Sequence, residues 1–282
     1  MSTPSEYEVT HLLDTDTVVL RNVRCGGTCR HRSVEECVST THLVFPYRGL
    51  YLRHVGDDQA VADANQVLFF NSNEGYQVSH PMAGGDASLS LAVSEPLLRE
   101  LAPKSLLNGR AVIGFRRQHL RIDHRAQALV AMLRHSLENG AIAPLEAEGL
   151  ALALVSSSLG PRTSREPGAT RSRRRLADRV KVLLASDLSR RWSLAEIGTE
   201  IRGSPVYLTQ VFQQTEGIPL YRYHLRLRLA RALHLIAKYD DVSRLAADLG
   251  FSSHSHFAAA FRQAYGRSPT AFKQSAQWAR NH

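Results

Sequence analysis

Three cysteines and a histidine lie within thirteen residues near the N-terminus, in the segment CGGTCRHRSVEEC. Thiolate and imidazole groups are good ligands for zinc, and the spacing from Cys25 to Cys29 falls within the range of such sites. The gap from His31 to Cys37 is looser, and no second close pair follows it. We therefore expect ordinary thiols, no metal and no cofactor, and keep Cys25, Cys29, His31 and Cys37 as an alternative metal- or redox-sensing set.

The segment SHPMAGGD, residues 79–86, also carries polar side chains. Pro81 fixes one backbone angle, and Gly84 and Gly85 permit conformations that other residues avoid. The segment predicts a hairpin turn. The functional alternative places His80 at the rim of a cavity.

Polar side chains also recur at helical spacing in SPVYLTQVFQQ, residues 204–214. A serine followed by a proline predicts the start of a helix there, with Leu208, Val211 and Phe212 facing inward. Glutamine pairs with adenine through two hydrogen bonds, and valine or threonine methyl groups contact the thymine methyl in a major groove. The opposite face therefore predicts base contacts by Val206, Thr209, Gln210 and Gln213.

A second segment, HSHFAAAFRQAY, has the same arrangement from residue 254 to 265. Its outward positions predict DNA contacts by His254, Ser255, His256, Ala259 and Arg262. Because alanine is too short to read a base by hydrogen bonding, this helix should supply mainly phosphate contacts and shape fitting, through Ser253, His256 and Arg262. The helix that contains Gln210 should contribute more to DNA-sequence specificity than this second helix.

The two segments belong to a tandem repeat of two helices joined by a tight turn. Residues 194–223 and 245–272 share a skeleton of apolar and glycine positions, offset by 48 residues before the turn and 49 after it. Gly250 supplies a left-handed backbone for the second turn, and Ser193 with Glu196 forms a capping box before the first unit. Two copies in register predict paired helix-turn-helix units, and the repeated positions are Ile197 and Leu245, Ile201 and Leu249, Leu208 and Phe257, Phe212 and Phe261, and Gly217 and Gly266.

A basic helix is expected between the two units. The segment YRYHLRLRLARALHLIAK, residues 221–238, alternates leucines with arginines. The leucines should pack both units onto this helix and hold them on one face of DNA, while some arginines contact phosphates.

Charge separates the chain of 282 residues into two halves. Residues 1–159 hold 14 Lys and Arg against 17 Asp and Glu, a net charge of −3, whereas residues 160–282 hold 21 against 9, a net charge of +12. A polyanion is therefore expected as partner of the second half only. The acidic N-terminus lacks the pattern of a signal peptide, and no run reaches the ~18 apolar residues of a membrane span, so a cytoplasmic location without membrane contact is expected.

Residues 18–115 consist largely of short segments rich in Val, Leu, Phe and Tyr, broken by Gly, Asn, Asp and Pro, which predicts a β domain. Helical periodicity follows from residue 95 to 159, and the last segment, PLEAEGLALALVSSSL, is apolar on several faces. It packs either within the chain or against a second copy in a homodimer. Residues 160–175 hold six arginines and no large apolar residue, which indicates a linker.

The expected fold is two-domain α+β. An N-terminal β-barrel with packed helices, residues 1–159, precedes the Arg-rich linker, residues 160–175, and an all-α domain with two helix-turn-helix units, residues 176–282. A small barrel of this kind encloses a pocket for one small ligand.

Residues 176–275 resemble the DNA-binding domain of AraC/XylS-type transcription regulators. The resemblance rests on SPVYLTQVFQQTEG, LRLRLARALHLI and LAADLGFSSHSHFAAAFRQAYGRSPTAF. It implies seven helices, with base contacts at Val206, Thr209 and Gln210 and then at Ser255, His256 and Ala259. The first turn departs from the family pattern, since Arg202 and Gly203 stand where a glycine and an apolar residue are usual.

The N-terminal half resembles, more loosely, the cupin-like effector domain of such regulators. It lacks the paired-histidine motif of metal-dependent cupins, which argues against catalysis. We therefore expect a bacterial, sequence-specific transcription regulator, an activator being one form, that responds to a small-molecule effector in the barrel. Its partners would be double-stranded promoter DNA, the effector and, for an activator, RNA polymerase. The alternative is a cupin-type enzyme with a DNA-binding appendage.

Overall fold

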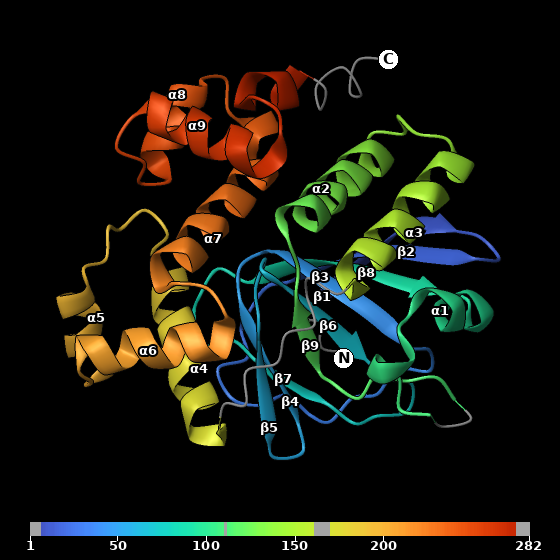
Figure 1. Ribbon diagram of the computed structural model, residues 1–282. Coiled ribbons are helices and arrows are strands. Elements are labelled where there is room, and N and C mark those ends of the chain that lie inside the picture. The colour runs from blue at the N-terminus through green and yellow to red at the C-terminus, as the bar shows by residue number, and fades with distance from the viewer. Residues whose placement is uncertain (1–6, 110–111, 161–169, 275–282) are drawn as a thin grey trace, which may run out of the picture. The chain divides into compact units, whose positions relative to one another are not determined.

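The computed structural model describes residues 7–109, 112–160 and 170–274. The chain divides into two compact units, residues 1–164 with 270–282 and residues 165–269. The expected helical domain, residues 176–282, differs from this division at both ends. The fold class is confirmed, because one unit is β structure with packed helices and the other is all-helical (Figure 1).

The strands of the first unit form two antiparallel sheets. A six-stranded sheet has the order β1-β2-β8-β3-β6-β9, and a three-stranded sheet has the order β5-β4-β7. The strands are β1 (Tyr7–Asp14), β2 (Val18–Cys25), β3 (His42–Arg48), β4 (Tyr51–Val55), β5 (Asp58–Ala62), β6 (Gln66–Phe70), β7 (Gln77–Ser79), β8 (Asp86–Val93) and β9 (His119–Arg121).

Strands β3 and β6 are buried on both faces, which explains their unbroken apolar runs. Side chains alternate across a strand, so Phe45 and Phe69 face the packed helices while Val44 and Leu68 face the three-stranded sheet. The two sheets and the helices therefore form three layers. The larger core lies between the six-stranded sheet and the helices.

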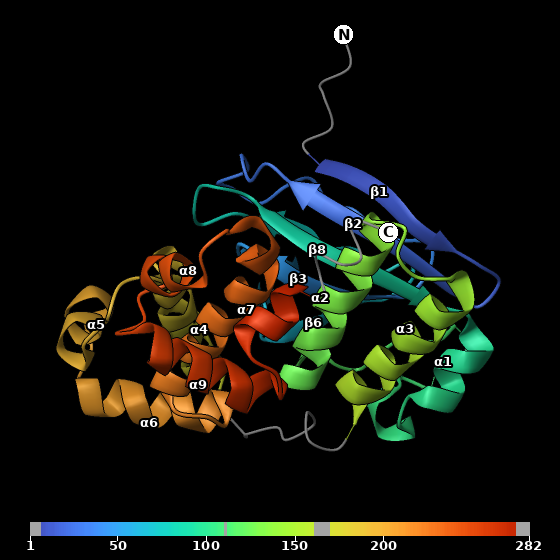
Figure 2. The same cartoon turned by 90° about the horizontal axis from the view of Figure 1, so that it is seen from above.

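The first unit has four helical segments among its described residues up to 160. Figures 1 and 2 show α2 and α3 side by side over the six-stranded sheet. Asp123 caps α2 by accepting a hydrogen bond from the Ala126 amide, and Gly140 takes a left-handed conformation just beyond its end. The segments are α1 (Glu95–Leu101), the 3-10 helix η1 (Lys104–Leu106), α2 (His124–Glu138) and α3 (Pro144–Leu159).

The second unit is helical throughout its described part. Helix α7 runs from the group formed by α4, α5 and α6 to the pair α8 and α9 (Figure 1). The segments are α4 (Arg171–Ser186), α5 (Leu194–Ile201), α6 (Pro205–Glu216), α7 (Leu220–Leu235), the 3-10 helix η2 (Ile236–Lys238), α8 (Val242–Asp248) and α9 (His254–Tyr265).

Three local expectations differ from the structure. Residues 171–175 of the predicted linker are helical, because Thr170 caps α4 and arginine is a good helix former; residues 161–169 of that linker lie outside the described residues. The strand β1 was not predicted. The helical spacing of Leu129, Met132 and Leu133 predicts that Met132 lies inside. Met132 is instead 39% exposed, since the polar Gln127 and Arg134 share the buried face of α2.

None of the helices in the described residues is both long and apolar enough to cross a membrane.

Candidate DNA-binding interface

The first two-helix element consists of α5, a tight turn and α6. The Ser193 hydroxyl accepts from the Glu196 amide, and the Glu196 carboxylate accepts from the Ser193 amide at 2.8 Å, so the predicted capping box is confirmed. Ser204 stands at the N-cap of α6 with Pro205 after it, but its side chain makes no capping hydrogen bond within the described part of the chain. Proline at this position therefore begins α6.

The turn between α5 and α6 depends on a left-handed residue that is not glycine. Arg202 has φ 57° and ψ 53°, and its amide donates to the carbonyl oxygens of Gly198 and Thr199. In the second element the corresponding residue is Gly250, with φ 75°. Glycine has no Cβ atom and adopts this left-handed conformation without cost. A residue with a side chain adopts it at a cost of about 1 to 2 kcal/mol. The departure noted in the first turn is therefore a local strain and not a different path of the chain.

Helix α6 presents the predicted polar face. Leu208, Val211 and Phe212 are buried, whereas Val206 is 66% exposed and Gln210 and Gln213 are exposed. The Thr209 hydroxyl donates to the Pro205 carbonyl oxygen at 2.8 Å. Because that hydroxyl is already bonded, the methyl group is what Thr209 offers to a partner.

The second element consists of α8, its turn and α9. A side chain at Gly250 would overlap the Ser189 carbonyl oxygen, so this position needs glycine for space as well as for its backbone angle. The Ser253 hydroxyl accepts from the His256 amide at 3.1 Å and caps α9, which ends before the left-handed Gly266. The predicted bounds of the second helix are confirmed.

The outward face of α9 carries two histidines, a serine and an arginine beside one alanine. His254, Ser255, His256, Ala259 and Arg262 are all exposed, as the spacing predicted. The His256 ring lies 5.6 Å from the Phe251 ring, and its Nδ1 is 3.0 Å from the Ser252 hydroxyl. His256 is therefore held in place before any partner arrives, and Ser253 is occupied as a cap.

Arg228 joins the two elements. Its guanidinium donates to the carbonyl oxygens of Leu188, Ser189 and Arg190, which precede α5, and to that of Gly250 in the second turn. The shortest of these hydrogen bonds, to Leu188, is 2.6 Å. One side chain on α7 thus fixes the chain before α5 and the turn before α9 to the same helix.

A buried ionic group also supports α6. Lys181 on α4 is 2% exposed and lies 2.5 Å from the Glu216 carboxylate at the end of α6 and 3.4 Å from that of Asp178. The Phe212 and Tyr223 rings pack edge to face beside it, 5.2 Å apart. Removing one partner of such a group leaves a buried charge unpaired, so the position of α6 depends on this contact.

The arginines of α7 differ in what they are free to contact. Arg222 is exposed, and its Nε donates to the Tyr221 hydroxyl at 3.0 Å. Arg228 is half-buried, and burial, followed by the charge of Arg191, lowers its pKa. Burial and then the Arg228 charge lower the pKa of His224 to about 4, so His224 is neutral near pH 7. The expectation that arginines of this helix contact phosphates therefore applies to Arg222 and not to Arg228.

Exposed aromatic side chains near the interface were missed by the sequence reasoning. Tyr207 is 47% exposed and Tyr221 is 63% exposed. The Arg190 guanidinium lies 4.0 Å from the centre of the Trp192 ring. An exposed aromatic beside an arginine is a signal that the sequence did contain at 190–192 and 221–222.

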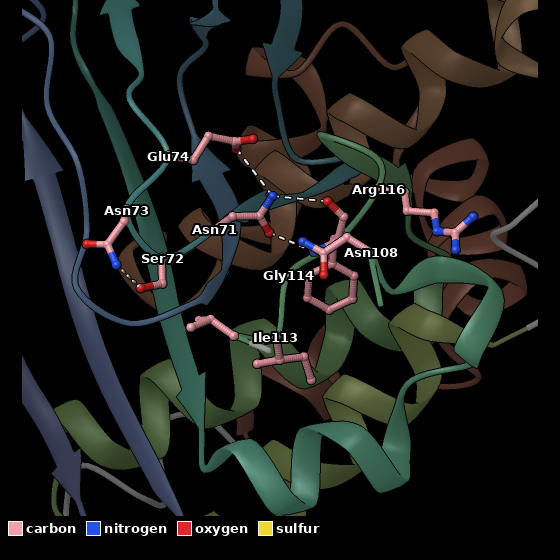
Figure 3. A pocket seen from close by; sticks show the side chains of 10 residues that line it. Asn71, Ser72, Asn73, Glu74, Asn108, Ile113, Gly114 and Arg116 are labelled. Atoms are coloured by element: carbon pink, nitrogen blue, oxygen red, sulfur yellow. Dashed lines mark hydrogen bonds between the residues drawn. The ribbon is translucent and has the colours of Figure 1, made fainter. Parts of the chain in front are cut away.

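The first unit holds a half-open pocket of about 840 Å³ (Figure 3). It lies between the loop after β6 and the segment before β9, and its lining includes Val112, Ile113 and Phe115. Asn71 holds the two sides together, because its side chain accepts from the Phe115 amide at 2.7 Å and donates to the Phe115 carbonyl at 3.0 Å. The space between the two sheets is instead filled by apolar side chains and by the buried Arg53 guanidinium, which lies 4.2 Å from the centre of the Phe70 ring.

Among the residues that the structure describes, the alternative set of Cys25, Cys29, His31 and Cys37 is not brought together. Within the described residues one cluster of potential metal ligands occurs, and it combines Cys25 with His80 and Asp86. Cys37 is exposed, and neither Cys29 nor His31 belongs to the cluster. His80, which the sequence placed in a turn or at a cavity rim, is instead buried and bonded to Asp86.

Comparison with known proteins bears on the second unit. Residues 197–275 match a family described as helix-turn-helix domain. The chain is 32% identical to the HTH-type transcriptional regulator GadX of Escherichia coli over 97 residues, which are 34% of this chain and 35% of GadX. The C-terminal domain is an AraC-type helix-turn-helix domain.

Two further relatives match over different lengths. The HTH-type transcriptional activator RhaR of Klebsiella pneumoniae is 28% identical over 156 residues, 53% of this chain and 54% of RhaR. A solved AraC-type transcriptional regulator from Chromobacterium violaceum is 22% identical, with 38% of this chain and 96% of that one covered, at a TM-score of 0.36. The chain thus spans about a third to a half of the curated relatives described here. The AraC-type assignment applies to the helix-turn-helix domain.

The first turn of this AraC-type domain predicts a stabilising substitution. Arg202→Gly should raise the free energy of unfolding by about 0.5 to 1 kcal/mol, because the relieved left-handed strain exceeds the added freedom of the unfolded chain. Gly250→Ala, at the equivalent position, should be strongly destabilising because its side chain meets the Ser189 carbonyl. Chemical denaturation of both variants measures this, and a loss of stability in Arg202→Gly would contradict the assignment of strain.

The junction predicts a second effect. Arg228→Met should lower the free energy of unfolding by about 2 kcal/mol, because charge-assisted hydrogen bonds to four carbonyls are lost. Arg228→Lys should keep only part of this free energy of unfolding, since one ammonium group cannot make the hydrogen bonds of a planar guanidinium. Arg222→Met, on the exposed side of the same helix, is the control. Equal effects of Arg228→Met and Arg222→Met in chemical denaturation would show that the junction is not anchored by Arg228.

Proposed function

We propose that this protein is a sequence-specific transcription regulator that binds double-stranded promoter DNA through α6 and α9. The observation that carries the proposal is the pairing of two helix-turn-helix elements on one helix, each with an exposed polar face. The net charge of +12 on residues 160–282 supports a polyanionic partner. RNA polymerase is a further partner if the protein is an activator.

The base-reading residues remain those predicted from the sequence. On α6, Val206 and Thr209 offer methyl groups and Gln210 offers an amide, which suit thymine and adenine in the major groove. On α9, His256 is fixed by Phe251 and Ser252, which reduces the entropy lost on contact. The short Ala259 limits what α9 can read. We therefore propose that α6 selects the sequence and that α9 adds phosphate contacts and fit.

The test of the function is selection of DNA by the full-length protein from a random library. Repeated rounds should enrich one motif, and the motif should be bound about 10³-fold or more tightly than random DNA at physiological salt. Equal affinity for selected and random DNA would overturn the proposal. The alternative is an enzyme, but the described residues that line the pocket do not include a nucleophile paired with a base. A turnover screen would test this alternative separately.

Gln210→Ala should weaken binding to the selected motif by about 1 to 3 kcal/mol and leave binding to random DNA unchanged. Gln214→Ala is the matched control, because Gln214 is also exposed on α6 but its side-chain oxygen accepts from Arg173 at 3.3 Å. His256→Ala should cost less than Gln210→Ala. Fluorescence anisotropy titrations with both DNAs measure these differences, and a larger loss of specificity in His256→Ala would reverse the division between the helices.

We further propose that a small-molecule effector binds in the 840 Å³ pocket of the first unit. Its lining combines amides and a carboxylate with apolar side chains, which suits a ligand with both polar and apolar parts. Helix α3 packs within the chain, since Ala151, Leu154 and Val155 are buried in the core, and a homodimer stays a prediction.

Val112→Trp should fill the pocket and weaken effector binding about tenfold or more, because Val112 is 52% exposed at the pocket wall. Val34→Trp, at an 80% exposed position outside the lining, is the control. Thermal unfolding in the presence of a metabolite library identifies ligands of the unmodified protein. If a ligand raises the midpoint of thermal unfolding of Val112→Trp as much as that of Val34→Trp, the effector binds outside this pocket.

A further inference from the structure

One thiol, one imidazole and one carboxylate meet at one end of the β unit. Ligand atoms of Cys25, His80 and Asp86 all lie within 4.8 Å of one another. The His80 Nε2 is 2.7 Å from the Asp86 Oδ2. His80 and Asp86 lie six residues apart, whereas Cys25 is more than fifty residues from either, so chain folding adds Cys25 to the cluster.

Strand pairing brings Cys25 and Asp86 together. Cys25 is the last residue of β2 and Asp86 is the first of β8, and they are paired directly across the antiparallel ladder. His80 follows the end of β7, where its amide donates to the Cys29 carbonyl oxygen at 2.8 Å. The cluster is therefore held by backbone hydrogen bonds on each of its sides.

Close backbone packing around the cluster requires glycine. Gly27 and Gly85 both have left-handed angles, with φ of 70° and 65°. A side chain on Gly85 would overlap the Cys25 carbonyl oxygen, and one on Gly27 would lie 2.6 Å from the Gly85 Cα. The segments carrying Cys25 and Asp86 can approach this closely only because these positions have no side chain.

Burial makes the imidazole and carboxylate costly unless they bind something. His80 is 2% exposed and Asp86 is 5% exposed. Asp86 occupies one ring nitrogen of His80, while the other, Nδ1, has no hydrogen-bond partner within the part of the chain that the structure describes. Buried polar atoms are normally paired with protein groups, ordered water or an ion, so this nitrogen needs a partner that the described residues do not supply.

We propose that Cys25, His80 and Asp86 bind one zinc-class divalent metal ion. Thiolate and imidazole ligands favour zinc or cobalt(II) over magnesium or calcium, and the negative charges of the thiolate and carboxylate balance the ion. Bond lengths of about 2.0 to 2.3 Å put tetrahedral zinc ligands roughly 3.3 to 3.7 Å apart, which small side-chain rotations reach from the observed separations. The fourth position stays open to water or a small ligand.

This ligand set differs from the alternative set that the sequence left open, in which Cys29, His31 and Cys37 accompanied Cys25. The proposal does not depend on DNA binding, and a failure of either leaves the other standing. The neighbouring Cys29 and Cys37 serve as controls, because they share the segment but not the cluster.

The test is titration of the full-length, chelator-treated protein with cobalt(II) and then zinc. One equivalent of cobalt(II) should give a thiolate-to-cobalt absorption band, which one equivalent of zinc removes. Cys25→Ser should abolish the band and weaken zinc binding about a hundredfold or more, since a direct ligand is lost. Cys29→Ser and Cys37→Ser should behave as the unmodified protein, and zinc should raise their midpoint of thermal unfolding.

Absence of stoichiometric binding in the unmodified protein would overturn the proposal. A band that survives Cys25→Ser but is lost in Cys29→Ser or Cys37→Ser would also overturn it, in favour of the sequence-derived set. Asp86→Asn and His80→Gln should each lower the affinity as well, with folding checked by circular dichroism. If either fails to fold, Cys25→Ser remains decisive, because Cys25 is only partly buried.

Discussion

The helical unit depends on the guanidinium of Arg228 more than on any other single side chain described here. It bonds the carbonyls of residues 188–190 and of Gly250, so one planar group sets the chain before α5 and the turn before α9 against α7. Gly250 must also lack a side chain there, because the Ser189 carbonyl takes the space. Two helix-turn-helix elements that bind the same DNA need a fixed separation from each other. The hydrogen bonds of Arg228 help to fix that separation.

The two helix-turn-helix elements share a core but divide the strain and the chemistry unequally. The second turn has the glycine that its geometry prefers, whereas the first forces Arg202 into the same left-handed conformation. The first carries a glutamine-rich face and the buried Lys181 contact beneath it, and the second carries a histidine fixed by an aromatic ring. The element with the more costly turn is thus the one whose exposed face carries the glutamines.

In the first unit, backbone packing creates a cluster of potential metal ligands that no sequence motif predicts. Glycines 27 and 85 let two segments touch, and the strand register then sets Cys25 against Asp86. The space between the sheets is filled by side chains, and the described pocket lies at the loops, where Asn71 ties the loop after β6 to Phe115. A pocket and a ligand cluster therefore occupy different parts of one small unit.

The sequence by itself determined the elements that depend on local periodicity and capping. The repeat from Ile197 to Gly266, the capping box at Ser193 and the exposed faces of α6 and α9 were all predictable, because helical spacing and chain-end hydrogen bonds are local. The tertiary structure alone decided the rest. The sequence did not show which arginines of α7 are free for phosphates, and four carbonyl partners occupy Arg228. Met132 is exposed because polar groups share the buried face of α2. His80 joined Cys25 through contacts between residues more than fifty positions apart. Such contacts follow from the packing of distant segments, which spacing along one chain does not encode.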